Sequence, residues 1–334
     1  MESHEILRVV DLQAHFHTHE GVVKAVDGAS FSITEGKALG VVGESGCGKS
    51  VTAQCILRIL PNPGEIVGGR VLFRPIGNHS QTIDLLTLAS RGPEIRSIRG
   101  GEISMVFQEP MTSLDPVYTV GAHLLEAILT HQKVDRAEGR ARAMEMLRRV
   151  KMSQPERIID AYPHQLSGGM RQRVMIAIAL SCHPRLLIAD EPTTALDVTT
   201  EAQILDLMRE LQQQFGSAIM YITHDLGVIA EISDDVIVMY LGKVVEQASV
   251  DALFYDPQHP YTRALLASIP RVTDTKRERL KAIQGIVPDP YAVPPGCPFW
   301  PRCPSYMGGV CDQVEPPWVA VGLDHHVRCH LYTG

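Results

Sequence analysis

The sequence predicts an α/β fold, and three observations carry this prediction. The apolar run at residues 39–42 is followed by the glycine-rich stretch 43–50 and then by a helix-like segment at 51–58. Further apolar runs at residues 103–107, 186–190 and 217–223 are typical of buried strands. Residues 112–183 carry apolar side chains at helical spacing. We therefore expect a strand–loop–helix core with an antiparallel β subdomain before the loop and an α-helical subdomain after it.

The stretch at residues 43–50 has the spacing G-x-x-x-x-G-K-S of a phosphate-binding loop. Its glycines let successive backbone N–H groups turn toward phosphate oxygens, and the following helix adds its positive end. We expect Lys49 to reach the β- and γ-phosphates and the Ser50 hydroxyl to bind Mg²⁺. The residues assigned to nucleotide binding here are Gly43, Glu44, Ser45, Gly46, Cys47, Gly48, Lys49 and Ser50.

Length, charge and hydropathy exclude several classes of protein. The chain has 334 residues, a length that suggests about two domains. Its formal net charge of -7 disfavours a protein that coats nucleic acid, because binding to phosphate backbones needs clustered cations. No apolar run approaches the roughly 18 residues that span a bilayer, and residues 1–5 lack the basic and apolar parts of a secretory signal. We expect a cytosolic location and reduced cysteines.

Short alternating runs at residues 7–12, 22–26 and 29–33 predict strands ahead of the phosphate loop. The aromatic stretch 15–19 lies between the first two runs. An adenine ring stacks on a flat apolar surface, which Phe16 or His17 could supply. A β-turn with a half-buried Phe16 explains the same stretch, and the sequence does not rank Phe16 above His17.

The strand predicted at residues 186–190 ends in two adjacent carboxylates, Asp190 and Glu191. Burying such a pair is costly unless a cation or water lies opposite. We expect Asp190 to bind Mg²⁺ and Glu191 to position or deprotonate an attacking water. Gln108 follows the strand at 103–107, where it can contact Mg²⁺ or that water, although most glutamines at strand ends are only solvated.

Three further positions carry polar groups at the ends of elements. Ser167, Gly168 and Gly169 precede a helix-like segment, a geometry that either holds an anion or simply caps the helix. Asp197 lies in a turn after the carboxylate strand. His224 follows the strand at 217–223 and can hydrogen-bond a γ-phosphate, although a histidine at such a place is more often structural.

In this order the motifs resemble those of the ATP-binding-cassette ATPase family over roughly residues 5–250. The resemblance implies a P-loop NTPase core, ATP and Mg²⁺ as ligands, and ATP hydrolysis with Glu191, His224 and Gln108 in catalytic roles. It also implies that Asp197 belongs to a loop at the nucleotide. Met170 departs from the family pattern, which often has Gln there. We expect little effect, because the Ser167 hydroxyl and the glycine N–H groups supply the phosphate contact.

Residues 105–116, 167–177 and 259–262 are similar to the dipeptide/oligopeptide importer subgroup of this family. The resemblance implies two cassettes facing head to tail, usually this chain and a second, related one, with the phosphate loop of one meeting Ser167 of the other. It implies two transmembrane permease subunits, which contact a groove beside Gln108 and the helical subdomain, and indirectly an extracytoplasmic substrate-binding protein. A peripheral position on the cytoplasmic face of the membrane and no nucleic-acid partner follow.

Four of the seven cysteines, Cys297, Cys303, Cys311 and Cys329, lie in a Pro- and Gly-rich tail in which we expect little regular structure. Their spacing is unlike the C-x₂-C pairs of zinc ribbons, and the compartment disfavours disulfides. It resembles the iron–sulfur motif of some dipeptide-importer ATPases, which implies a [4Fe–4S] cluster on these four residues. Zinc stays an alternative because His325, His326 and His330 lie nearby, and so do free thiols or disulfides.

We therefore expect a nucleotide-binding domain at residues 1–255, with its helical subdomain at about 112–183, and a small irregular cysteine-rich extension at 256–334. The cargo is left open, since this subgroup also imports nickel and oligosaccharides. A non-transport cassette ATPase is a further alternative, but its usual second cassette, long coiled coil or zinc insertion is missing. A regulatory iron–sulfur protein with an inactive cassette is disfavoured by the joint presence of Lys49, Asp190, Glu191 and His224.

Overall fold

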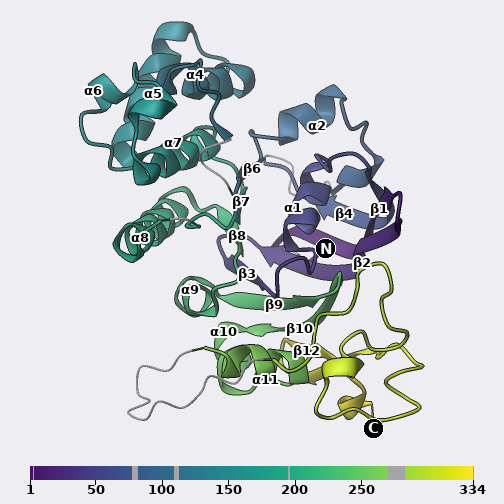
Figure 1. Cartoon of the computed structure of the whole chain (residues 1–334). Coiled ribbons are helices and arrows are strands. Elements are labelled where there is room, and N and C mark those ends of the chain that lie inside the picture. The colour runs from purple at the N-terminus through teal and green to yellow at the C-terminus, as the bar shows by residue number, and fades with distance from the viewer. Residues whose placement is uncertain (3, 77–81, 109–112, 195, 270–282, 334) are drawn as a thin grey trace, which may run out of the picture. The chain divides into compact units, whose positions relative to one another are not determined.

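The computed structural model of the chain describes residues 1–2, 4–76, 82–108, 113–194, 196–269 and 283–333 (Figure 1). These residues form two compact units. The first comprises Met1–Leu7, Ile33–Lys37 and Leu72–Tyr221, and the second comprises Arg8–Ser32, Ala38–Val71 and Ile222–Gly334. The predicted start of the helical subdomain at about residue 112, and residues 270–282 of the predicted extension, lie outside the described residues. The predicted domain boundary at residues 255/256 stays a prediction.

Helices and strands alternate along most of the chain. In order they are β1 (Glu5–Thr18), β2 (Gly21–Thr34), β3 (Ala38–Val42), α1 (Lys49–Leu57), β4 (Gly64–Phe73), β5 (Ile83–Asp84), η1 (Leu85–Thr87), α2 (Pro93–Ile98), β6 (Ile103–Val106), α4 (Val120–His131), α5 (Arg136–Arg149), α6 (Pro155–Ile158), η2 (Pro163–Gln165), α7 (Gly168–Leu180), β7 (Leu186–Asp190), α8 (Val198–Phe215), β8 (Ala218–Ile222), α9 (Leu226–Ile232), β9 (Asp235–Tyr240), β10 (Lys243–Ser249), α10 (Val250–Tyr255), α11 (Pro260–Ala267), η3 (Trp300–Arg302), β11 (Trp318–Gly322), β12 (His325–Arg328) and η4 (His330–Tyr332).

In the first unit, β8, β7 and β6 are neighbours in one sheet in that order. β6 and β7 are parallel, with Ile103 opposite Leu186 and Val106 opposite Ala189. Every residue of β7 is buried, which agrees with its continuous apolar sequence. Since parallel strands place their carboxyl ends at the same edge of a sheet, Gln108 and Glu191 leave the sheet side by side.

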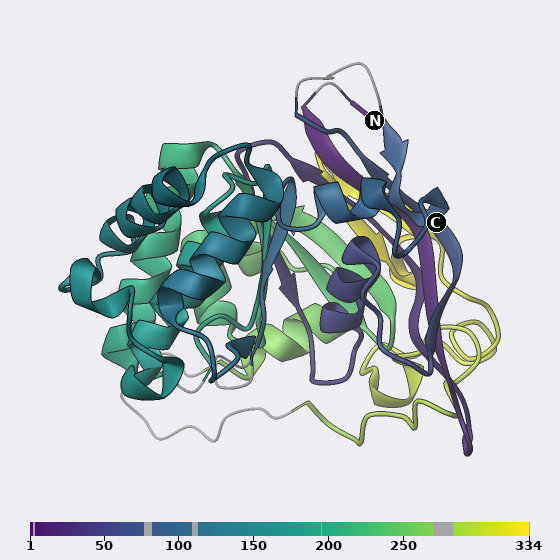
Figure 2. The ribbon, with the colours of Figure 1, turned by 90° about the horizontal axis from the view of Figure 1, so that it is seen from above.

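The predicted helical subdomain is present in the first unit, where α4, α5, α6 and α7 lie together (Figures 1 and 2). Side chains cap α4, α5 and α7 where the sequence changes from loop to helical spacing. The Thr119 hydroxyl accepts a hydrogen bond from the Ala122 N–H at 3.2 Å at the start of α4, and the Asp135 carboxylate accepts one from the Glu138 N–H at 2.8 Å at the start of α5. These caps fix where each helix begins.

In the second unit, five strands are neighbours in the order β11-β12-β10-β9-β3. β3 runs parallel to β9, whereas β9, β10, β12 and β11 form antiparallel pairs. β3 is wholly buried, and α9 packs against it so closely that a Cβ at Gly40 would lie 2.8 Å from Cγ2 of Ile229. Most of β1, β2 and β4 also belongs to this unit, with β1 between β2 and β4.

The tail is more regular than the sequence predicts. Residues 318–328 form a β-hairpin, and its strand β12 pairs antiparallel with β10, with Val327 opposite Glu246. The prediction of an irregular extension is therefore wrong for this stretch. The strands β11 and β12 are only five and four residues long, and β12 pairs with β10, a partner about 80 residues earlier that no local pattern indicates.

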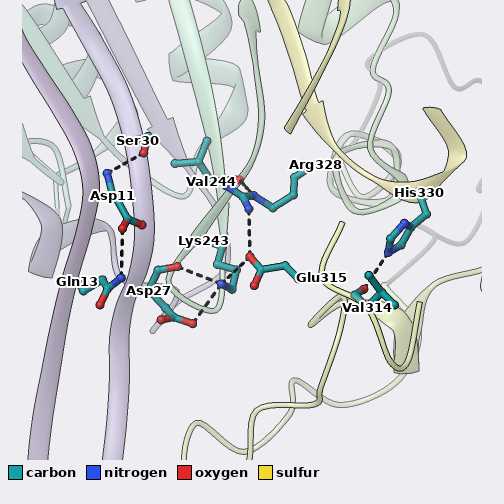
Figure 3. Close-up of polar contacts among 10 residues, drawn as sticks. All are labelled: Asp11, Gln13, Asp27, Ser30, Lys243, Val244, Val314, Glu315, Arg328 and His330. Atoms are coloured by element: carbon teal, nitrogen blue, oxygen red, sulfur yellow. Dashed lines mark hydrogen bonds and ion pairs between the residues drawn. The ribbon is translucent and has the colours of Figure 1, made fainter. Parts of the chain in front are cut away.

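The strands before the phosphate loop are longer than predicted. β1 continues through the aromatic stretch to Thr18, and β2 covers both runs predicted at residues 22–26 and 29–33. β2 continues through Gly28, although this residue has φ of 89°. On β1, Asp11 has φ of 48° and its N–H donates to the Ser30 hydroxyl at 2.8 Å (Figure 3).

Candidate functional site

The phosphate loop joins β3 to α1 in the second unit, as predicted. Its shape requires glycine at two positions. A Cβ at Gly43 would lie 2.2 Å from the Met239 carbonyl oxygen, and a Cβ at Gly48 would lie 2.2 Å from that of Ala25. Both residues also have positive φ, 151° and 103°. The loop is thus packed directly against the backbone of β9 and β2, which fixes the direction of its N–H groups.

Lys49 is the first residue of α1 and is buried. Its Nζ donates to the carbonyl oxygen of Gly43 at 2.7 Å and to that of Glu44 at 3.2 Å, and it lies 3.8 Å from Sγ of Cys47. Burial raises the pKa of the Cys47 thiol, which therefore stays neutral beside the ammonium group. Ser50, the predicted Mg²⁺ ligand, follows Lys49 on α1 and is half-buried.

Glu44 has partners that the sequence did not indicate. Its carboxylate accepts two hydrogen bonds from Arg302, at 2.7 and 3.0 Å, and its N–H donates to the Tyr261 hydroxyl at 2.9 Å. Arg302 lies 258 residues later, in the tail, so no spacing rule connects the two. The only local signal is an arginine beside a cysteine in a Pro-rich segment.

Both candidates for adenine stacking lie near the end of β1. Phe16 is half-buried, and its Cε1 is 2.8 Å from the point where Gly64 of β4 would carry a Cβ. His17 is exposed, and its N–H donates to the Pro63 carbonyl oxygen at 3.4 Å. Each side chain thus keeps an accessible face, and the choice between them stays a prediction.

In the first unit, the structure brings Gln108 and Glu191 together. Nε2 of Gln108 donates to Oε2 of Glu191 at 2.8 Å, and the Thr194 hydroxyl donates to the same oxygen at 2.9 Å. Glu191 has φ of 45°, a strained conformation that turns the chain sharply after β7. Asp190, the last residue of β7, is buried with 3% of its surface exposed. The Glu191 carboxylate is thus oriented by two donors, whereas Asp190 is buried at the end of β7.

The signature residues form an accessible helix start in the first unit. Ser167 caps α7 by accepting a hydrogen bond from the Met170 N–H at 3.3 Å, and Ser167 and Gly168 are exposed. Gly169 is close to α8, because a Cβ there would lie 2.8 Å from Cγ2 of Thr200. Met170 contributes its backbone N–H to the cap, and the small effect expected for this departure from the family pattern stays a prediction.

Asp197 caps α8 beside the signature residues. Its carboxylate accepts hydrogen bonds from the N–H of Thr200 at 3.0 Å and from the hydroxyl of the same residue at 2.8 Å, and these bonds lower the pKa of Asp197. His224 belongs to the second unit, where it is exposed between β8 and α9. The catalytic or ligand-binding roles assigned to both residues stay predictions.

The four tail cysteines, called the cysteine group below, lie in the second unit. Cys297, Cys311 and Cys329 are buried, Cys303 is half-buried, and all four are free thiols. Cys297 and Cys311 are joined by a 2.8 Å hydrogen bond between the Cys297 N–H and the Cys311 carbonyl. Burial, with a smaller effect of the three other thiols, raises the pKa of Cys297 to about 12. Among the described residues, no three His, Cys, Asp or Glu side chains are arranged to hold a single metal ion.

The histidines near the cysteine group have other partners. Nε2 of His325 is 2.8 Å from the buried Glu246 carboxylate, and Nε2 of His330 is 2.8 Å from the Val314 carbonyl oxygen (Figure 3). The His326 ring stacks on Trp318 with 5.8 Å between ring centroids. Each of the three histidines that kept zinc as an alternative therefore already has another partner.

Within the part of the chain that the structure describes, none of the helices combines the length and the apolar character needed to cross a bilayer.

A family model described as "ABC transporter" matches residues 26–194, about half of the chain, which includes the phosphate loop, the signature and both carboxylates. The chain belongs to the ABC transporter family. A second model, described as "Oligopeptide/dipeptide transporter, C-terminal region", matches residues 245–311 of this ABC protein. The family prediction is thereby confirmed, and so is the importer subgroup.

Full-length relatives support the same assignment. This ABC protein is 51% identical to the probable peptide ABC transporter ATP-binding protein y4tR of Sinorhizobium fredii, over 97% of this chain and 94% of the relative. It is 49% identical to the oligopeptide transport ATP-binding protein AppD of Bacillus subtilis, over 98% and 97%. A solved structure, the dimeric bacterial ABC transporter cassette MJ0796, is similar with a TM-score of 0.63 and 28% identity, over 73% of this chain and 99% of that one. The chain is thus an ATP-binding, ATP-hydrolysing ABC subunit.

Proposed function

We propose that this protein is the ATP-hydrolysing subunit of an importer for dipeptides or oligopeptides. The observation that carries the proposal is the match of residues 245–311 to the C-terminal region of oligopeptide and dipeptide transporters, in one chain with the ABC motifs. The peptide-transport names of relatives that are 45–51% identical over nearly the whole chain support it. The protein works on the cytoplasmic face of the membrane with permease subunits, and a second, related cassette completes its dimer.

In this proposal the loop residues 43–50 hold the phosphates of ATP, with Lys49 at the β- and γ-phosphates. Ser50 and Asp190 bind Mg²⁺, and Gln108 contacts the metal or the attacking water. Glu191 acts as the base, and its bonds to Gln108 and Thr194 support this role because they hold the carboxylate in one orientation. His224 contacts the γ-phosphate, and Phe16 or His17 stacks on adenine.

The remaining site residues act across the dimer. Ser167 and the N–H groups of Gly168 and Gly169 bind the γ-phosphate held by the other cassette, and Asp197 joins them at that interface. The exposure of Ser167 and Gly168 at the start of a 13-residue helix supports the proposal, because N–H groups at a helix start favour anions. ATP then closes the dimer and hydrolysis opens it, which drives the permease.

Uptake by cells tests the cargo and the motor together. In a strain that lacks this gene, we expect uptake of labelled dipeptides to return with the wild-type gene and with Lys133→Ala, an exposed lysine, and to stay at the level of the deletion strain with Lys49→Ala. Loss of nickel or oligosaccharide uptake instead of peptide uptake would reassign the cargo. If the deletion changes none of these uptakes, the protein is not an importer subunit.

We further propose that the cysteine group holds a [4Fe–4S] cluster. Three observations support this assignment. Three of the four thiols are buried, none of the four is in a disulfide, and the nearby His325 and His330 already have other hydrogen-bond partners. When bound, such a cluster supplies a cross-link between four segments of the tail. Cys297, Cys303, Cys311 and Cys329 would hold it as thiolates, and because burial raises the pKa of Cys297, this thiol would give up its proton only when its sulfur binds iron.

Anaerobic purification tests the cluster. We expect the wild-type protein and Cys182→Ser, a cysteine of the first unit, to contain iron and acid-labile sulfide in equal amounts and to be brown. Cys303→Ser, which removes the half-buried member of the cysteine group, should lose most of the iron and the colour. Zinc in place of iron, or intact iron in Cys303→Ser, would overturn the assignment.

A further inference from the structure

Arg302 connects the tail to the phosphate loop through a set of contacts that lies entirely within the second unit. Its side chain is only 3% exposed, and its two terminal nitrogens donate to both oxygens of the Glu44 carboxylate at 2.7 and 3.0 Å. Its Nε donates to the Gln284 carbonyl oxygen at 3.2 Å, and Nη1 donates to the Tyr240 hydroxyl at 3.3 Å. A two-pronged pair of this kind fixes the orientation of both side chains.

An aromatic cluster of Tyr240, Tyr261 and Phe299 holds the guanidinium in place. The ring centroids of these three residues are 4.6–5.3 Å apart, and the Arg302 guanidinium lies 5.9 Å from the centroids of Tyr240 and Phe299. Tyr261 of this cluster also accepts the hydrogen bond from the Glu44 N–H at 2.9 Å. Glu44 is thus held by its side chain and its backbone, and both partners lie beyond residue 260.

The charge of Glu44 makes this contact relevant to the nucleotide. Glu44 is the second residue of the loop that holds phosphates, and 26% of its side chain is exposed. An unpaired carboxylate there would repel a triphosphate, because like charges at short range raise each other's energy. Arg302 removes this repulsion by neutralising the carboxylate. The carbonyl of Glu44 also accepts a bond from Lys49, so the position of Glu44 affects the lysine that meets the phosphates.

We propose that Arg302, a residue of the C-terminal tail, is a positioning residue for ATP binding that neutralises and orients Glu44 in the phosphate loop. The proposal rests on the proposed function, since it concerns the affinity of the same loop for ATP. It assigns to the tail a direct effect on the nucleotide, so the tail is coupled to ATP binding through one ion pair.

The test is the ATP dissociation constant of the full-length protein, measured by titration with Mg-ATP at low and high salt. We expect Arg302→Gln to weaken ATP binding about tenfold, a change that corresponds to about 1.4 kcal/mol. The loss should shrink at high salt, because ions screen the repulsion between Glu44 and the triphosphate. Glu44→Gln combined with Arg302→Gln should restore most of the affinity, since it removes the repelling charge.

Arg328 provides a matched control. Like Arg302 it directly precedes a member of the cysteine group and pairs with a carboxylate, but its partner is Glu315 at 3.0 Å, in a network with Lys243 and Asp27 (Figure 3). Arg328→Gln should therefore leave the ATP affinity unchanged. If Arg302→Gln binds ATP like the wild type, or if the double variant binds as weakly as Arg302→Gln, the inference is wrong.

A further variant distinguishes a folding defect from a loss of ATP affinity. If Arg302→Gln does not fold, Arg302→Lys is measured in its place. This variant keeps the positive charge but loses the two-pronged contact with Glu44, so it should bind ATP more weakly than the wild type, by less than about tenfold. ATP binding equal to that of the wild type would overturn the inference. A wild-type protein that binds no ATP would overturn the proposed function itself, and not only this inference.

Discussion

Replacing Glu191 with Gln should lower ATP turnover by about 10²–10⁴-fold, the usual contribution of a general base, while ATP binding stays intact. The glutamine keeps the size of the side chain and an oxygen that can accept the bonds from Gln108 and Thr194. It cannot take a proton from water. Phosphate release by the protein assembled with its partner cassette measures turnover, and size-exclusion chromatography with Mg-ATP detects the closed dimer that should accumulate.

Glu210→Gln is the matched control for this variant. Glu210 is an exposed carboxylate of α8 that pairs with Lys151 at 2.6 Å, and an exposed pair of this kind contributes little to stability. It should therefore turn over ATP like the wild type. Unchanged turnover in Glu191→Gln would remove Glu191 from the role of base, and loss of ATP binding would show that the variant disturbs the site itself.

The second large effect concerns acid stability, through His259 at the start of α11. The side chain is 1% exposed, and its Nδ1 accepts a hydrogen bond from the Tyr261 N–H at 3.0 Å. Burial, with a smaller effect of Arg263, lowers the pKa of His259 to about 3. The unfolded chain takes up this proton near pH 6.5, whereas the folded chain does not until about pH 3. This histidine therefore lowers the free energy of unfolding by about 1.4 kcal/mol for each pH unit below about 6.5.

His259→Asn isolates this contribution. Asparagine also caps helices, so the variant keeps a side-chain acceptor for α11 but has no group that titrates. At pH 7.5 the wild type should be the more stable of the two, because the imidazole packs on Phe299 with 5.8 Å between ring centroids. Urea denaturation at several pH values should show this advantage shrinking as the pH falls from 6.5 to 5. A difference that does not depend on pH would contradict the prediction.

The sequence predicted those parts of the site whose chemistry is encoded within a few neighbouring residues. The phosphate loop, the cap at Ser167 and the carboxylates after β7 each depend on an apolar strand or a helix next to a short motif, and the structure has each of them in that context. The contact between Gln108 and Glu191 was not itself predicted, and it arises because two parallel strands bring their carboxyl ends to one edge.

Contacts between distant segments could not be predicted in this way. Arg302 meets Glu44 across 258 residues, and β12 pairs with β10 across about 80. Neither leaves a periodic signal in the chain, since one depends on a single side chain and the other on a four-residue strand. The two separate runs predicted at residues 22–26 and 29–33 are one strand, β2, because β2 pairs with the equally long β1.

Glu246 shows how the rest of the chain depends on its last quarter. This fully buried carboxylate on β10 accepts bonds from the N–H groups of Gln258 and His259 and lies against His325, and every one of these partners comes after residue 255. A shortened protein ending there would keep a desolvated acid with none of its donors, next to a strand edge open to other chains. The part of the chain before residue 256 therefore depends on the residues that follow it. A shortened or fused version of the protein must include both parts.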